Sequence, residues 1–216
     1  MLRRLLLGRR CALCREPMGL KIPEHARICQ TCAKEVRQSY RCTHSKAVAC
    51  CARSDAALLY KDQVRRAMVR VKFYHNTNAL HWFAEQTTAR LLANLDDWKP
   101  DLVTFVPTSP LRKWMRGYNQ SEVLARRAAE RCGLPCADCL RRRPFGKRQS
   151  RMSSDQERRR NAAHAFLPRD GVRLDGKRVV LVDDILTTGA TAEVCARLLL
   201  YLGASEVCLL TATRVP

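Results

Sequence analysis

Residues 178–191, Arg-Val-Val-Leu-Val-Asp-Asp-Ile-Leu-Thr-Thr-Gly-Ala-Thr, constrain the fold of this chain more than any other segment. The apolar run 179–182 predicts a buried strand that ends at two aspartates. A turn rich in threonine follows, and the apolar periodicity of residues 192–202 predicts a helix that Gly203 ends. Ligands of open α/β sheets bind at the carboxyl ends of the strands. The segment therefore predicts an α/β fold with a ligand site at this turn.

The residue types in the turn suit a sugar phosphate. Backbone N–H groups at the start of a helix, in a turn that glycine keeps open, favour a phosphate monoester, and threonine hydroxyls add donors. The carboxylates of Asp183 and Asp184 are too negative to contact phosphate, but they suit ribose hydroxyls or Mg²⁺ held through water. The predicted 5-phosphate loop comprises Thr187, Thr188, Gly189, Ala190 and Thr191.

The string from Val180 to Thr191 is similar to the 5-phosphoribosyl 1-pyrophosphate (PRPP) motif of type I phosphoribosyltransferases. It is not a Walker motif, because no Gly-x-x-x-x-Gly-Lys-Ser/Thr run exists in the chain. The resemblance implies that the aspartates hold ribose and Mg²⁺ and that the loop holds the 5-phosphate of PRPP.

A second turn follows residues 101–106, which read as a buried strand. Its basic side chains are placed to pair with a diphosphate, and arginine is the better residue for bidentate contacts. Asn119 lies at a predicted helix start, where capping alone would also explain it. The predicted pyrophosphate loop comprises Pro107, Thr108, Arg112 and Arg116.

Helical periodicity fills the segments between the predicted strands. Residues 60–74 and 79–95 read as amphipathic helices, with residues 96–100 breaking the second. A third helix is predicted from Ser121 to about Arg131. Strands that alternate with helices indicate a parallel sheet flanked by helices, as in Rossmann-like folds.

Cysteine spacing predicts a small metal-binding module at the N-terminus. Two Cys-x-x-Cys pairs supply four thiolates, which satisfy a closed, structural tetrahedral Zn²⁺ site. The predicted ligands are Cys11, Cys14, Cys29 and Cys32. A second, irregular metal site is an alternative that the sequence does not decide; its ligands would be Cys42, His44, Cys50 and Cys51.

Charge is concentrated in two zones of this 216-residue chain of net charge +20. Residues 1–53 carry 12 Lys and Arg against 3 acidic residues, and residues 112–160 carry 15 against 5. Such zones bind nucleic acid or a polyanion such as a pyrophosphate, although a solvated basic surface gives the same pattern. Residues 140–161 read as a flexible basic loop, either a lid over PRPP or a disordered segment.

No apolar run approaches the length of a membrane span. The run of three leucines at 5–7 is too short for the apolar core of a signal peptide. The expected location is the cytoplasm. There disulfides are rare, so clustered cysteines indicate metal.

The order of motifs resembles the ComF family. The motifs are the Cys pairs, Tyr60 with Val-Lys-Phe at 71–73, Val-Pro at 106–107, Arg-Gly-Tyr-Asn-Gln at 116–120 and the PRPP motif. The resemblance implies a type I phosphoribosyltransferase fold (residues 55–216) behind a zinc ribbon (residues 1–54), and a link to DNA uptake in natural competence. The degenerate Cys42 to Cys51 region and Met152, where leucine is usual, depart from the family pattern.

Two functions follow as hypotheses. In the first, the chain binds PRPP with Mg²⁺ and transfers phosphoribosyl groups, with acceptor and catalytic residues unassigned. In the second, a non-catalytic protein binds single-stranded DNA, or regulates competence, and uses the fold as a scaffold or PRPP sensor. Trp114 and Tyr118 could stack bases within the second basic zone. DNA-uptake and recombination proteins are the expected partners, and the oligomeric state stays open.

Overall fold

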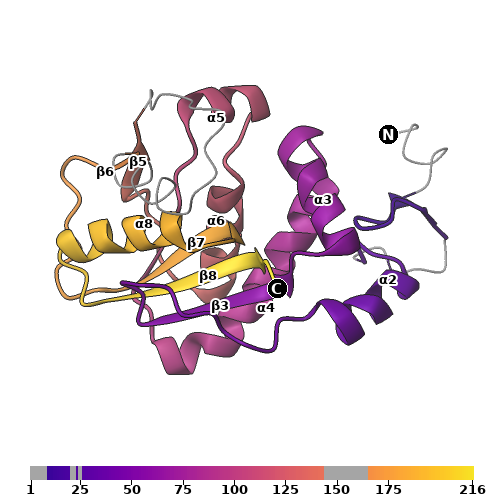
Figure 1. The fold of residues 1–216 in the computed structure, drawn as a ribbon, viewed down its shortest axis with the longest axis horizontal. Coiled ribbons are helices and arrows are strands. Elements are labelled where there is room, and N and C mark those ends of the chain that lie inside the picture. Colours follow the sequence, from indigo (N-terminus) through magenta and orange to yellow (C-terminus); the bar gives the residue numbers. More distant parts are fainter. Residues whose placement is uncertain (1–8, 20–22, 24–25, 144–164) are drawn as a thin grey trace.

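The computed structural model describes residues 9–19, 23, 26–143 and 165–216. At its centre lies a parallel sheet of four strands in the order β3-β8-β7-β4 (Figure 1). The strands are β3 (Arg53–Leu59), β4 (Leu102–Phe105), β7 (Arg178–Leu186) and β8 (Glu206–Arg214). The predicted α/β class with a parallel sheet is therefore confirmed.

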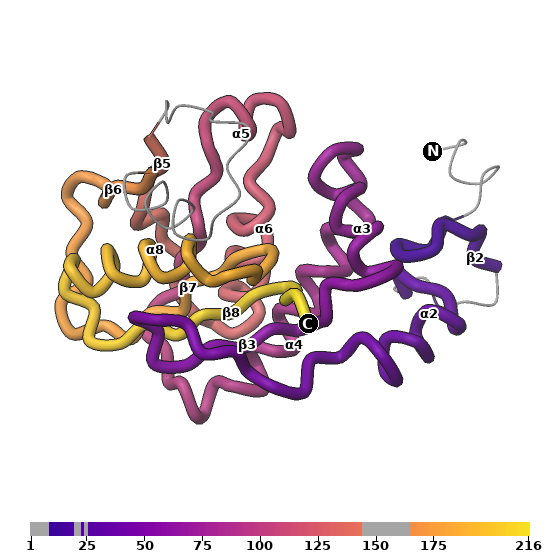
Figure 2. Tube along the Cα trace, viewed as in Figure 1, coloured from indigo at the N-terminus to yellow at the C-terminus, as the bar shows by residue number. Residues whose placement is uncertain are grey.

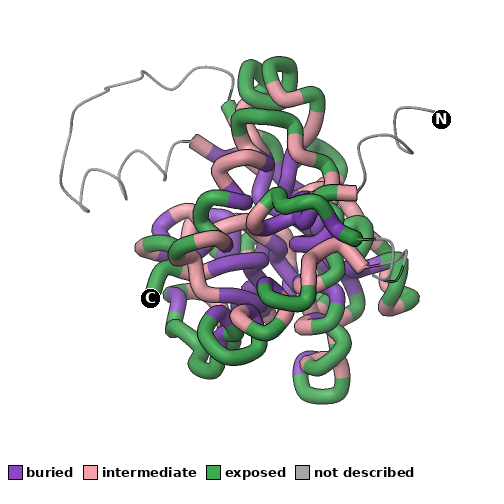
Figure 3. The backbone as a smooth tube through the Cα atoms, turned by 90° about the vertical axis from the view of Figure 1, so that its right-hand side faces the viewer, coloured by how far each residue is buried: buried purple, intermediate pink, exposed green. Residues whose placement is uncertain are grey.

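Helices cover both faces of the sheet, because a parallel sheet has to be buried on both sides. The helices are α3 (Asp62–Phe73), α4 (Thr77–Trp98), α5 (Pro110–Arg116), α6 (Gln120–Cys132) and α8 (Ala190–Tyr201). Alternate residues of β7 face opposite cores. Val180 and Val182 pack in the cluster that contains α4 and α6, whereas Val179 and Leu181 pack in the cluster that contains α8. Figure 3 shows these buried segments at the centre of the molecule.

The N-terminal module consists of an antiparallel hairpin and two short helices. Its elements are β1 (Arg9–Arg10), β2 (Pro17–Met18), α2 (Gln30–Glu35) and the π-helix η1 (Val36–Tyr40). The module lies beside α3 (Figure 2), and its Leu13 and Val36 belong to the same apolar cluster as Met68 of α3. The module thus shares a core with the helix next to it.

Two predicted element ends were wrong. The strand expected to end at Asp183 continues to Leu186, because β8 still pairs with it: Asp183 lies opposite Thr211, and Leu186 opposite Arg214. The helix expected to break at residue 96 continues to Trp98, whose side chain is buried. Burial of this tryptophan offsets the poor helix propensity of the aspartates before it.

One strand of the central sheet and one short hairpin strand were not predicted. β3 was not predicted. Residues 140–142, expected to begin a flexible loop, form β5 (Leu140–Arg142), which pairs antiparallel with β6 (Phe166–Pro168). Residues 144–161 of the expected basic loop lie outside the described residues.

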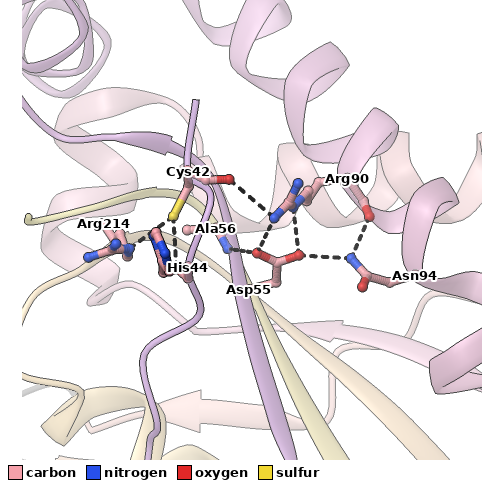
Figure 4. Close-up of polar contacts among 7 residues, drawn as sticks. All are labelled: Cys42, His44, Asp55, Ala56, Arg90, Asn94 and Arg214. Carbon is pink, nitrogen blue, oxygen red and sulfur yellow. Dashed lines mark hydrogen bonds and ion pairs between the residues drawn. The ribbon is translucent and has the colours of Figure 1, made fainter. Parts of the chain in front are cut away.

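A buried ion-pair network ties the edge strand β3 to α4 and to the N-terminal segment (Figure 4). Arg90 donates to both carboxylate oxygens of Asp55, over 2.6 Å from Nε and 2.8 Å from Nη2, and Asn94 donates to the same carboxylate over 3.0 Å. Nη2 of Arg90 also donates to the carbonyl of Cys42 over 3.3 Å. With the Asp55 side chain only 11% exposed, this carboxylate depends on its hydrogen bonds for stabilisation.

Replacing Arg90 by methionine should therefore destabilise the protein. The change leaves the Asp55 carboxylate short of donors, so the free energy of unfolding should fall by about 2 kcal/mol, the scale of hydrogen bonds to charged groups. Urea denaturation of the full chain measures it. Arg127→Met is the matched control, because Arg127 pairs with Glu130 on the surface, and it should change stability by less than about 0.5 kcal/mol. Equal losses in the two variants would contradict the assigned role of the network.

Candidate functional site

A cavity of about 310 Å³ opens at the carboxyl ends of β4 and β7. It exists because β7 is longer than its neighbour. The amide of Val106 donates to the carbonyl of Val182 over 3.0 Å, and the pairing of β4 with β7 ends at Phe105 and Val182. From Asp183 onward β7 is paired with β8 alone. The opposite edge of β7 therefore faces the cavity.

The cavity brings together side chains from four parts of the chain. Its lining comprises Tyr60, Lys72, Val106, Pro107, Thr108, Arg112, Arg116, Asn119, Gln120, Ser121, Arg142, Asp183, Asp184, Ile185, Thr187 and Thr191. All four residues of the predicted pyrophosphate loop and both predicted aspartates are among them. Thr188, Gly189 and Ala190 of the predicted phosphate loop are not, although they connect two residues that are.

The two aspartates form the acidic side of the cavity. Ser121 Oγ and the Asp184 amide donate to Asp183 Oδ1 over 3.0 and 2.8 Å, and Lys72 Nζ lies 2.8 Å from Asp184 Oδ2. Burial, and then the negative charge of Asp184, raise the pKa of Asp183, while the Asp184 amide, Lys72 and Ser121 oppose the shift. A bound cation would favour the charged form of this carboxyl. Adjacent carboxylate oxygens are donors of the type that Mg²⁺ prefers, so the pair fits that ion.

The opposite side of the cavity is cationic. Arg112 and Arg116 come from α5, which is a helix where the sequence predicted a turn, and the Ser109 hydroxyl caps its start by accepting from the Arg112 amide over 3.3 Å. Burial and the charge of Arg112 lower the pKa of both Arg116 and Arg142. These guanidiniums nevertheless stay protonated, so they crowd positive charge at one place. Such a cluster favours a polyanionic ligand.

The turn before α8 has the backbone shape expected of an anion-binding loop. Gly189 precedes the helix with φ +91°, a left-handed conformation that L side chains rarely adopt. A Cβ there would also lie 3.4 Å from both Cγ atoms of Val48. Lys46 Nζ donates to the Thr187 carbonyl over 2.7 Å, which fastens the loop to the N-terminal part of the chain.

Several polar residues that line the cavity were not predicted as site residues. They include Tyr60, Lys72, Ser121 and Arg142. Arg142 carried a signal, the run of three arginines at 141–143, but its position on β5 could not be read from the sequence. Lys72 and Tyr60 were noted only as parts of the motifs that resemble the ComF family, with no role in the site. Asn119 combines two roles, because it caps α6 by position and donates through Nδ2 to the Val106 carbonyl over 3.1 Å.

The four predicted zinc ligands meet in the N-terminal module. The Sγ atoms of Cys11, Cys14, Cys29 and Cys32 all lie within 4.8 Å of one another. The Cys29 amide donates to Cys11 Sγ over 3.3 Å, and the Cys32 amide to Cys29 Sγ over 3.5 Å, contacts that stabilise thiolates. Four thiolates at this spacing could hold Zn²⁺ in a closed site, which is called the four-cysteine site below.

A second cysteine group does not assemble within the described parts of the chain. The four-cysteine site is the one group of three or more potential metal ligands that they contain. Cys42 instead donates to the His44 carbonyl over 3.1 Å and accepts from Arg214 Nε over 2.9 Å (Figure 4). Its thiol therefore has a structural role in the junction between the N-terminal segment and β8.

Comparison with known proteins identifies the class of the C-terminal part. Residues 119–216 match the family model of the phosphoribosyl transferase domain. The DNA utilization protein YhgH of Salmonella typhimurium is 30% identical over 220 residues, which cover 91% of this chain and 93% of that protein. Competence protein F of Haemophilus influenzae is 33% identical over 109 residues, a match that spans 50% of this chain and 48% of that protein. The chain belongs to the ComF family of competence and DNA utilization proteins.

Solved phosphoribosyltransferases are more distant. Adenine phosphoribosyltransferase from Saccharomyces cerevisiae matches with a TM-score of 0.44 and 16% identity, over 86% of this chain and 89% of that chain. A purine phosphoribosyltransferase from Pyrococcus horikoshii matches with a TM-score of 0.40 and 23% identity, over 62% of this chain and 82% of that chain. In the described part of the chain, no helix has the length and apolar character needed to cross a membrane.

The four-cysteine site predicts a metal content. Protein purified without chelator should contain about one zinc per chain, and Cys32→Ser should lower both the zinc content and the thermal midpoint, because metal binding contributes to folding of the module. Elemental analysis and thermal unfolding measure the two effects. Cys132→Ser, outside the cluster, is the control and should retain its zinc. A wild-type protein free of zinc would refute the site.

Proposed function

We propose that this protein binds PRPP with Mg²⁺ in the cavity at the carboxyl ends of β4 and β7 and acts as a phosphoribosyltransferase. The observation that carries the proposal is that one cavity joins an acidic pair to a group of arginines. PRPP has the matching pattern, because its ribose hydroxyls lie between a monophosphate and a diphosphate. The family model matched by residues 119–216 supports the same reading.

Each group of residues then has a role. Asp183 and Asp184 hold the ribose hydroxyls and Mg²⁺, and residues 187–191 hold the 5-phosphate. Arg112 and Arg116, with Pro107 and Thr108, hold the diphosphate. Magnesium would neutralise charge on the diphosphate. In a transfer reaction the arginines would stabilise the charge that develops on the leaving pyrophosphate, since they already face the position where it forms.

The proposal also covers the two modules, the cellular location and the process in which the protein takes part. Zinc in the four-cysteine site would stabilise the module predicted as residues 1–54. The transferase-like domain, predicted as residues 55–216, also takes in Arg53 and Ser54, because β3 begins at Arg53. Cysteines that cluster as metal ligands fit the proposed cytoplasmic location, because disulfides are rare there. Participation in DNA uptake is proposed from the names of the relatives, which are competence and DNA utilization proteins.

Removing the charge of the acidic pair tests PRPP binding. The double variant Asp183→Asn/Asp184→Asn should lose Mg²⁺-dependent PRPP binding in calorimetry, because neutral amides hold neither the ion nor the ribose hydroxyls as strongly. Asp96→Asn/Asp97→Asn is the matched control: it neutralises another adjacent pair, exposed on α4, and should bind as wild type does. Unchanged affinity in the first variant would refute the proposed site.

A second candidate function, single-stranded DNA binding, is favoured by an exposed aromatic surface beside the cavity. Trp114 is 83% exposed, and Phe73 and Tyr74 at the end of α3 are 65% and 71% exposed. Arg116 joins the two helices, with its Cζ 5.4 Å from the centre of the Phe73 ring. Basic groups among exposed aromatics are the usual means of binding single strands by stacking.

The DNA proposal predicts a stacking contribution from Trp114. Trp114→Ala should weaken binding of a labelled single-stranded oligonucleotide by about tenfold, within the range measured for loss of one base–aromatic stack. Affinity should also fall steeply as salt rises. Tyr201→Ala is the matched control, since Tyr201 is equally exposed, at 82%, but lies on α8. Salt-insensitive binding, or equal losses in both variants, would refute this surface.

A further inference from the structure

Helix α3 contacts the four-cysteine site through Arg70. Its Nη2 donates to the carbonyl of Ala12 over 3.3 Å and also to the carbonyl of Leu13. These two residues lie between Cys11 and Cys14 and are each 1% exposed. The guanidinium therefore supplies hydrogen bonds to buried carbonyls inside the first Cys-x-x-Cys loop.

The same helix contacts the cavity through the next two residues. Tyr118 Oη donates to the carbonyl of Val71 over 2.8 Å, and Lys72 Nζ lies 2.8 Å from Asp184 Oδ2. The Lys72 and Asp184 side chains are 23% and 14% exposed, so their ion pair is shielded from solvent. Tyr118 follows α5, whose last residue, Arg116, lines the cavity.

Residues 70–72 thus join the two sites within one helical turn. A helix rises about 1.5 Å per residue, so residues 70 and 72 lie about 3 Å apart along the axis, and a shift of this turn moves both. The side chain of Val71 is 1% exposed and belongs to the large apolar cluster, which leaves the segment little freedom to deform. Figure 1 shows α3 standing between the N-terminal module and the rest of the domain.

We propose that Arg70 is a positioning residue: it anchors α3 on the first cysteine loop and thereby sets the Lys72–Asp184 ion pair for PRPP, so that the four-cysteine site and the cavity are coupled. This inference rests on the proposed function. The fit of charge supports it, because Zn²⁺ held by four thiolates would carry two net negative charges beside this guanidinium. Among the described residues, Arg70 Nε is buried without a hydrogen-bond partner, so the loop carbonyls are the acceptors that hold the group.

Coupling of this kind is reciprocal. If an intact cysteine loop favours PRPP binding, then bound PRPP must favour zinc retention by the same factor. Loss of zinc opens the loop and takes away the acceptors of Arg70. PRPP affinity should then fall even though no residue that lines the cavity has changed.

The test uses the full-length, zinc-loaded protein and calorimetric titration with PRPP and Mg²⁺. Arg70→Met should keep its zinc, because the four ligands are intact, yet bind PRPP at least about fivefold more weakly. Arg70→Lys, which retains donors for the two carbonyls, should recover most of the affinity. Arg65→Met removes a charge from the exposed side of α3 and should bind as wild type does.

A second measurement follows zinc rather than PRPP. Release of zinc to a chromogenic chelator should be slower in wild type when PRPP is present, and PRPP should have no effect on release from Arg70→Met. Wild-type affinity in Arg70→Met, or zinc release that PRPP does not change in wild type, would overturn the coupling alone. A wild-type protein that binds no PRPP would overturn the proposed function and the coupling with it.

Discussion

The functional part of the molecule depends on the unequal length of two paired strands. The pairing of β4 with β7 ends at Val182, while β7 continues along β8 for four more residues. The aspartates are therefore held by a ladder on one side of β7, and on its other side the strand borders the cavity. A side chain on a strand is held more precisely than one on a loop, which suits the proposed grip on ribose and metal. The basic helix that follows β4 then faces the aspartates across the space that β4 leaves open.

Helix α3 links the N-terminal module to the cavity. One of its faces packs into the main apolar cluster, one residue binds the cysteine loop and another pairs with the acidic site. The N-terminal module has too few residues to bury a core of its own, so it shares one with this helix. Under the proposed coupling, a metal that stabilises the module would also stabilise the wall of the cavity to which α3 contributes Lys72.

The site around β7 could be predicted from local sequence patterns. The contacts of Lys72 and the strand β3 could not, because they depend on long-range packing. The apolar run, the aspartates and the glycine turn are contiguous, so their order alone indicated a strand, a ligand site and a helix. Lys72 could not be predicted, because its contact with Asp184 depends on where α3 docks against the 118–121 region. β3 was missed for a similar reason: its sequence, Arg-Ser-Asp-Ala-Ala-Leu-Leu, lacks the alternation of a strand, and the side chains that stabilise its acidic residue, Arg90 and Asn94, come from the distant α4.

The pairing of residues 41 and 42 with the edge strand β3 limits where the chain can be truncated. β3 lies at the margin of the sheet, and residues 41 and 42 shield its outer side, through an antiparallel bridge from Arg41 to Leu58 and a bond from the Cys42 amide to the Ala57 carbonyl. A fragment that starts at Arg53 would expose a row of unpaired backbone groups, the feature by which sheets recruit further strands and aggregate. A well-behaved transferase-like fragment would therefore have to keep the segment from Arg41 onward, and the sheet would carry part of the N-terminal module with it.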